Sequence, residues 1–167
     1  MNHLSIRHQL REHTHSLHER VDESAASYDL GTVEGLRSFL EMMVRGLGQV
    51  EAGLEHGDVQ KFAPDWPMRA RLHLAMEELG LSVAPAPVEA TVFRSEAEIW
   101  GALYVLEGSR LGSRVLWQAA ADSAFLRASS EDREWPAFLT ALEQAHARLN
   151  DLPGMVEGAR KAFNAFL

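Results

Sequence analysis

Cysteine is absent from this 167-residue chain. The protein therefore has no disulfide, no thiolate nucleophile and no thiolate ligand for a metal. Basic residues are also in the minority, with 16 Lys and Arg against 24 Asp and Glu and a formal net charge of -8. General binding to nucleic acid depends on Lys and Arg contacts to phosphate, so we expect no nucleic-acid partner.

Long hydrophobic runs are missing as well. No segment approaches the roughly 20 apolar residues that cross a membrane, and residues 1–12 lack the apolar core of a signal peptide. We therefore expect no membrane association and a cytoplasmic location. The hydrophobic fraction of 46% suits one domain, residues 1–167, with a substantial core.

Alternating runs of β-branched and aromatic residues are absent, whereas helix start and stop signals recur along the chain. The sequence therefore predicts an all-α fold. Residues 83–88, which hold two prolines, are expected to form a stiff extended connector. The expected helices cover residues 5–27, 32–54, 65–80, 95–126, 129–150 and 153–166.

One expected helix contains three glycines in an otherwise favourable sequence. Gly101, Gly108 and Gly112 are separated by seven and four residues, so they share one face, with Ser109 and Ser113 beside it. Each glycine costs roughly 1 kcal/mol relative to alanine inside a helix. The missing side chains allow another helix or a flat cofactor to approach the backbone closely. The glycines alone do not decide between these two partners.

The first expected helix has a stripe of mostly apolar residues beside a row of polar residues. The stripe has helical spacing, and Arg11, His18 and Asp22 form the row of polar residues on the neighbouring face. A metal-bound histidine usually donates its second ring N–H to a carboxylate, carbonyl or water, and Asp22 lies one turn from His18. The same pair is also a common surface ion pair. The stripe consists of Leu10, Thr14, Leu17 and Val21.

Two other metal sites are alternatives. His15 and His18 are three residues apart but lack a third zinc ligand nearby, and helical zinc pairs usually stand four apart. Di-iron sites need Glu-x-x-His pairs on two helices, which Glu12 with His15 and Glu143 with His146 provide. No further glutamates that would complete such a bundle are evident in the sequence.

Four segments in the same order resemble heme oxygenases. Residues Leu10-Arg-Glu-His-Thr-His-Ser-Leu-His18-Glu-Arg-Val-Asp22 are similar to the proximal-helix motif, in which a leucine, a basic residue, a threonine and the heme-ligating histidine keep this spacing. Residues 104–112 look like the distal-helix motif of bacterial members. Residues 65–80 and 157–163 are similar to the middle segment and the last helix. Many members have paired glycines where this chain has Gly112-Ser113.

The resemblance implies a single-domain heme oxygenase-like fold, with heme between a proximal N-terminal helix and a glycine-containing distal helix. It implies that His18 is the axial ligand of the heme iron, with Asp22 or water beside it. Gly108 and Gly112, with Ser109 and Ser113, would form the catalytic distal side. The heme propionates would meet Arg11 and Arg160, with Tyr104 and Lys161 as further candidates.

The activity implied by the resemblance is cleavage of heme with O2 and reducing equivalents to biliverdin, carbon monoxide and ferrous iron. Electrons would come from an external donor of the ferredoxin or flavoprotein type, and Arg110 and Arg114 are candidates for the edge of its docking patch. A heme carrier or sensor without turnover is the main alternative. A thiaminase-like enzyme would need a cysteine, and a helical interaction module would leave the glycine face unexplained.

Overall fold

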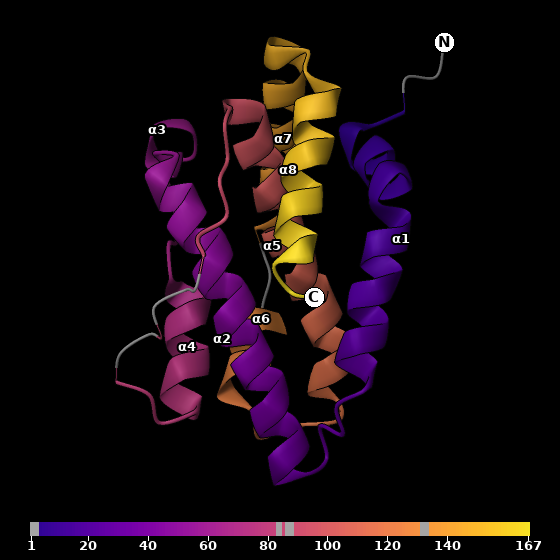
Figure 1. Ribbon diagram of the computed structural model, residues 1–167. Coiled ribbons are helices and arrows are strands. Elements are labelled where there is room, and N and C mark those ends of the chain that lie inside the picture. The colour runs from indigo at the N-terminus through magenta and orange to yellow at the C-terminus, as the bar shows by residue number, and fades with distance from the viewer. Residues whose placement is uncertain (1–3, 83–84, 86–88, 131–133) are drawn as a thin grey trace.

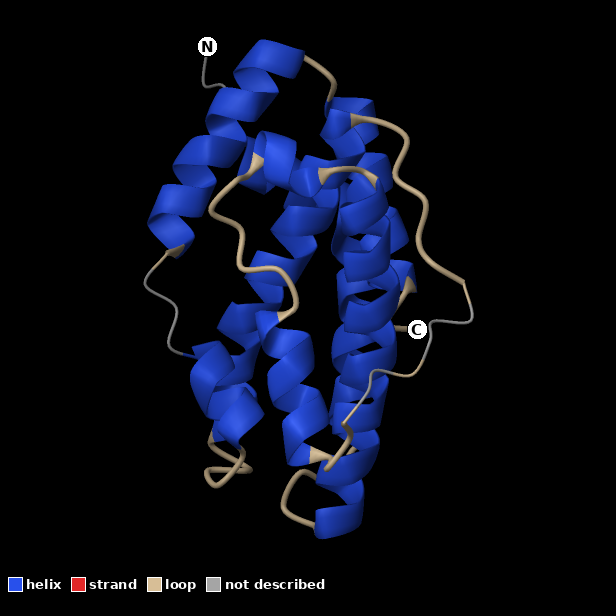
Figure 2. Cartoon of the chain, turned by 90° about the vertical axis from the view of Figure 1, so that its left-hand side faces the viewer, coloured by secondary structure: helices blue, strands red, loops and turns tan. Residues whose placement is uncertain are grey.

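The computed structural model describes residues 4–82, 85, 89–130 and 134–167, and this part of the chain contains helices and no strand (Figure 2). The predicted all-α class is confirmed. The helices are α1 Ile6–Ala26, α2 Val33–His56, α3 Val59–Phe62, α4 Ala70–Glu78, α5 Glu96–Trp117, α6 Ala124–Ser130, α7 Trp135–Leu149 and α8 Leu152–Asn164.

Short polar side chains begin the main helices. Thr32 accepts a hydrogen bond from the Gly35 N–H at 3.0 Å at the start of α2. Ser95 accepts from the Glu98 N–H at 3.2 Å, and Asp151 accepts from the Gly154 N–H at 2.9 Å. Each bond satisfies a backbone donor that has no partner within its helix. The predicted starts of α2, α5 and α8 are confirmed.

The helix expected over residues 65–80 is shorter than predicted and does not begin near Asp65. The first turn of α4 follows Arg69, whose backbone is left-handed with φ of 62°. Pro64 and Pro67 explain the difference, because each removes an N–H donor and disfavours helical geometry in the residue before it. A separate short helix, α3, was not predicted.

The glycine-containing helix was predicted to reach Leu126, but α5 ends at Trp117 and α6 is a separate helix. A contact from another part of the chain produces this break. The Glu78 carboxylate at the end of α4 accepts the Phe125 N–H at 2.9 Å and the Ser123 hydroxyl at 3.1 Å. A cap supplied by a distant residue is not visible in local sequence.

Two other predicted segments include residues that the structure does not describe. The predicted helix over 129–150 corresponds to α7, which begins at Trp135, and residues 131–133 lie outside the described part. The connector predicted over residues 83–88 also lies outside it, apart from Pro85.

The central packing joins α5 to α8, and Figure 1 shows these helices side by side, with α1 on one side and α2 on the other. Glycine allows the close approach. A side chain at Gly101 would collide with the Met155 carbonyl of α8, and one at Gly158 would collide with the Glu98 carbonyl of α5. Of the two partners that the sequence left open for the glycine face, a helix and a flat cofactor, Gly101 therefore meets the helix.

Among the described residues, no helix has both the length and the apolar character required to cross a membrane. The cytoplasmic location stays a prediction.

Candidate functional site

A cavity of about 480 Å³ lies between α1, α2 and the second half of α5. This volume is within the range of roughly 300–1,000 Å³ that is usual for cofactor and small-molecule sites. Most of its lining is apolar, and among the described residues one carboxylate, that of Asp22, reaches it. The apolar walls are provided mainly by Val21, Phe39, Met42, Met43, Val105, Leu116, Trp135, Phe163 and Phe166.

The α1 wall contributes His18, the only histidine among the described lining residues. Its side chain is 50% exposed, its Nε2 lies 3.7 Å from the Asp22 carboxylate, and its ring lies 5.7 Å from the Phe163 ring. The 3.7 Å separation is too long for a direct hydrogen bond. By contrast, His15 pairs with Glu19 at 3.1 Å and does not line the cavity.

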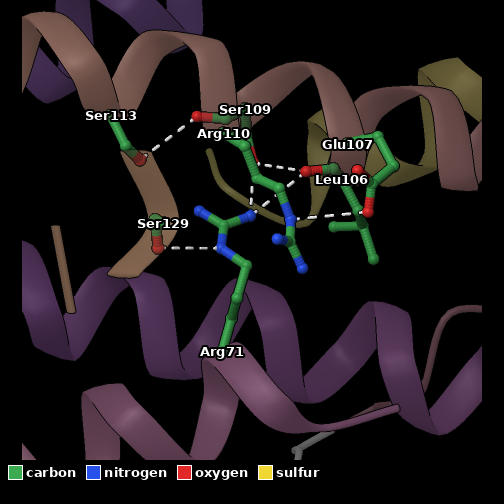
Figure 3. Close-up of polar contacts among 7 residues, drawn as sticks. All are labelled: Arg71, Leu106, Glu107, Ser109, Arg110, Ser113 and Ser129. Atoms are coloured by element: carbon green, nitrogen blue, oxygen red, sulfur yellow. Dashed lines mark hydrogen bonds and ion pairs between the residues drawn. The ribbon is translucent and has the colours of Figure 1, made fainter. Parts of the chain in front are cut away.

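The α5 wall is formed by bare backbone. A Cβ added at Gly108 or at Gly112 would meet no atom within 4 Å, so both glycines border open space. The hydroxyls beside them bond back to their own helix. Ser109 donates to the Leu106 carbonyl at 2.7 Å, and Ser113, which is buried, donates to the Ser109 carbonyl at 3.3 Å (Figure 3).

Two arginines lie near a tyrosine in the cavity lining. Arg7, Arg11 and Tyr104 all line it. Burial raises the pKa of the Tyr104 hydroxyl, while the positive charges of Arg7 and Arg11 lower that pKa and so oppose the shift. The Arg7 guanidinium also lies 5.6 Å from the centre of the Trp135 ring, a cation–π contact. Two cations and a phenol in the lining would suit the carboxylates of an otherwise apolar ligand.

Arg160 and Lys161, the predicted basic residues of the last helix, do not line this cavity. The Lys161 ammonium lies 2.6 Å from the Glu98 carboxylate and donates to the Val92 carbonyl at 3.0 Å. Arg160 is exposed. Their assignment to propionates stays a prediction, and Arg7 is a basic residue at the cavity that sequence reasoning missed.

Arg71 of α4 is a second lining residue that was missed. Its buried guanidinium donates to Ser129 at 3.1 Å, to Ser109 at 2.5 Å and to the Leu106 carbonyl at 3.1 Å (Figure 3). Burial and the nearby Arg110 lower its pKa to about 10, so Arg71 remains a cation at neutral pH. It therefore holds the turn of α5 that precedes Gly112. Arg71 lies within residues 65–80, which resemble the middle segment of heme oxygenases, but the sequence analysis predicted no role for it.

Arg110 and Arg114 were expected at the edge of an exposed patch. Only 17% of the Arg110 side chain is exposed, and it pairs with buried Glu107 at 3.4 Å. Arg114 is exposed and donates to the Ser130 carbonyl at 3.1 Å. Arg110 is therefore part of the interior and does not offer a docking surface.

The residues of the alternative metal sites have other surroundings. Glu143 accepts the Ile6 N–H at 2.8 Å and so caps the start of α1. Among the described residues, no group of three or more His, Asp or Glu side chains is placed to hold a metal ion together.

The cavity combines a histidine on one helix, bare backbone on another and two arginines near a tyrosine. This arrangement fits a flat apolar ligand that carries a metal and peripheral carboxylates. The imidazole could bind the metal, the glycines leave room for a flat ring and a small ligand, and the cations match the carboxylates.

Known proteins with similar sequence and structure agree with this chemistry. None of the protein-family models matches the chain. A heme oxygenase from Xanthomonas campestris pv. campestris (strain 8004) is 34% identical over 113 residues, which cover 60% of this chain and 67% of that protein. The NO- and CO-bound heme oxygenase from Neisseria meningitidis has a similar fold, with a TM-score of 0.80 and 22% identity, over 98% of this chain and 89% of that one. The chain belongs to the heme oxygenase family.

Proposed function

We propose that this protein cleaves heme with O2 and electrons to biliverdin, carbon monoxide and ferrous iron. Bound heme would serve both as the group that activates O2 and as the substrate that is opened. The observation that carries the proposal is the composition of the cavity. It brings His18 of α1 together with Gly108 and Gly112 of α5, whose missing side chains leave open space.

His18 would bind the iron through an imidazole nitrogen. Asp22 is close enough, at 3.7 Å from the ring nitrogen, to orient the imidazole through a small change of rotamer or through a water. The half-exposed position of His18 at the cavity wall leaves its ring accessible to a ligand. Phe163 would limit the rotation of the ring from the α8 side.

Helix α5 would form the cavity wall across from His18. It would keep the space next to the reacting face of the heme small. Gly108 and Gly112 admit a small ligand next to the backbone, and Arg71 with Ser109 fixes the turn between them. The Ser113 hydroxyl donates to the Ser109 carbonyl of its own helix, so it is not a free donor towards the cavity. With heme bound, the apolar part of the lining would limit the water that could supply uncontrolled protons.

The two arginines and the tyrosine would orient the ligand. Arg11 and Tyr104 would meet one propionate, and Arg7, supported by the Trp135 ring, would meet the other. Electrons would come from a ferredoxin- or flavoprotein-type donor. A docking patch for that donor cannot include Arg110, because this residue is paired with Glu107 and mostly buried.

The test begins with the visible spectrum of the purified protein after addition of hemin. We expect a sharp Soret band, followed in air with ascorbate by bleaching and by biliverdin that can be identified by chromatography. Catalase is included, because it removes free peroxide that could degrade heme without the enzyme. A stable heme complex that never yields biliverdin would favour the carrier or sensor.

The assignment of the ligand is tested by substitution. His18→Ala should abolish the histidine-ligated spectrum, because no other described histidine lines the cavity. His15→Ala is the matched control, since His15 lies three residues away and pairs with Glu19 on the surface. Loss of ligation in His15→Ala alone would refute the assignment of His18.

A further inference from the structure

A second, smaller cavity, which we call the side cavity, has a volume of about 190 Å³ and adjoins the proposed heme site. Met42 of α2 and Phe166, which follows α8, line both cavities and so form the wall between them. The heme site is mostly apolar, whereas hydroxyl, amide and guanidinium groups line much of the side cavity. The wall at Phe166 therefore separates two spaces of different polarity. The polar groups of the side cavity belong to Ser24, Tyr28, Arg45, Gln49 and Asn164.

A glycine of α2 provides the seat for the Phe166 ring. A side chain at Gly46 would collide with three carbon atoms of that ring, so the ring occupies the space that the glycine leaves free. Gly46 is buried, and only 6% of Phe166 is exposed. By contrast, a Cβ added at Gly48 would meet no atom within 4 Å. Glycine is unfavourable inside a helix relative to alanine, and the contact with Phe166 gives Gly46 a structural reason.

The same end of α8 reaches the proposed iron ligand. The Phe166 N–H donates to the Phe163 carbonyl at 3.1 Å, and the Phe163 ring lies 5.7 Å from the His18 ring. Displacing Phe166 would disturb the turn that carries Phe163. The position of Phe166 should therefore be detectable in the spectrum of heme bound to His18.

We propose that Phe166 determines which tetrapyrroles the cavity accepts, because its ring, seated on Gly46, closes the apolar heme site against the polar side cavity. Behind this wall, Arg45 could pair with a carboxylate. Arg45 is exposed, so a carboxylate beside it would also keep contact with water. This inference rests on the proposed function, since it concerns the ligand of the same site.

The wall faces a part of heme that carries no charge. The propionates are assigned to Arg7, Arg11 and Tyr104, none of which lines the side cavity. The edge that meets Phe166 and Met42 would then be one that bears vinyl and methyl groups. A carboxylate at that edge would lose water without gaining a partner, which is unfavourable. Phe166 should therefore favour heme over tetrapyrroles with additional carboxylates.

The first experiment tests the seat of Phe166 in the heme-free protein. Gly46→Ala should lower the melting temperature by on the order of 5 °C, because the methyl group displaces the ring. Gly48→Ala is the matched control and should not lower it. In a Phe166→Ala background, adding Gly46→Ala should cost little, because the ring is gone. An equal loss with and without the ring would overturn the seat; Phe166→Leu serves as the background where Phe166→Ala does not fold.

The second experiment compares two ligands by absorbance titration. Hemin has two propionates, whereas iron coproporphyrin III has propionates in place of the two vinyl groups. Wild type should bind hemin more tightly than iron coproporphyrin III by roughly tenfold or more. In Phe166→Ala this preference should fall by about tenfold, because the added carboxylates can enter the side cavity. The same preference in wild type and Phe166→Ala would overturn the role of Phe166 in specificity.

Arg45 tests whether the side cavity receives the added carboxylates. Arg45→Ala in the Phe166→Ala background should restore most of the preference for hemin, because the cation that pairs with them is gone. Arg45→Ala alone is the control and should leave the preference unchanged, since Phe166 still closes the wall. A reduced preference that does not depend on Arg45 would overturn the role of the side cavity.

The spectrum of bound hemin gives an independent measurement. Gly46→Ala should shift the Soret band, because the displaced Phe166 disturbs Phe163 beside His18, whereas Gly48→Ala should not. Identical spectra of wild type and Gly46→Ala would overturn the link between Phe166 and His18. Failure of the proposed function would appear as a wild type that binds neither porphyrin. Failure of this inference would appear as a wild type that binds hemin with a preference that Phe166→Ala does not change.

Discussion

Gly101 and Gly108 lie two turns apart on α5, yet the missing side chain has a different function at each position. The first half of the helix uses glycine to admit another helix, because a side chain at Gly101 would collide with the α8 backbone. In the second half, Gly108 and Gly112 have no atom within 4 Å of an added Cβ, and both line the cavity. The same residue type on one face therefore supports folding in one half and ligand access in the other.

The difference has a cause outside the helix. Alongside the first half, α8 packs closely, and its own Gly158 removes a second side chain from the contact. Alongside the second half, the cavity separates α5 from α1 and α2, which contribute His18 and Met43 to the opposite walls. Each half can therefore be changed without the other.

The largest expected effect is on stability in the packed half. Gly101→Ala should lower the free energy of unfolding by about 2–3 kcal/mol, because α5 and α8 must move apart to accept a methyl group. Urea denaturation of the heme-free protein measures this. Gly158→Ala should behave alike, since it meets the α5 backbone. Wild-type stability in both variants would mean that glycine is not needed at this contact.

The next effect is on ligand binding in the open half. Gly108→Leu or Gly112→Leu should reduce hemin affinity by roughly tenfold or more, about 1.4 kcal/mol, because the side chain would fill the space next to the backbone. The heme-free variants should remain folded. Hemin titration measures the affinity.

A smaller substitution provides the control for that half. Gly108→Ala should raise the stability of the heme-free protein by up to about 1 kcal/mol, because alanine favours the helix and meets no atom. Normal hemin binding and turnover in both leucine variants would show that this half does not face heme.

The smallest effect concerns the orientation of heme against the open half. Arg7→Ala and Arg11→Ala should each retain most of the hemin affinity, because a partly exposed ion pair is worth at most about 1 kcal/mol. Two seatings of the ring can differ by a similar amount, so the biliverdin isomers should become more mixed. Chromatography of the isomers measures this. A mixed product from Arg160→Ala, but not from Arg7→Ala, would support the assignment of Arg160 predicted from the sequence.

Local patterns predicted much of the molecule. The helix starts predicted at residues 32 and 95 depend on side chains that bond to nearby backbone. The stripe that includes Leu10 and Thr14, and the row of Arg11, His18 and Asp22, depend on helical spacing. Both are properties of a few consecutive residues. They were sufficient to predict an all-α chain and the two helices that carry most of the polar cavity residues.

What the sequence determined by itself was therefore the long helices, though not all of their ends, and the faces that they present, including the histidine and the glycines. The tertiary structure decided which partner each face meets. It placed α8 against Gly101 and open space against Gly108, brought Arg7 and Arg71 to the cavity, and paired Lys161 with Glu98. The physical reason is range, because spacing along one helix defines a face, whereas the atoms opposite that face belong to segments dozens of residues away.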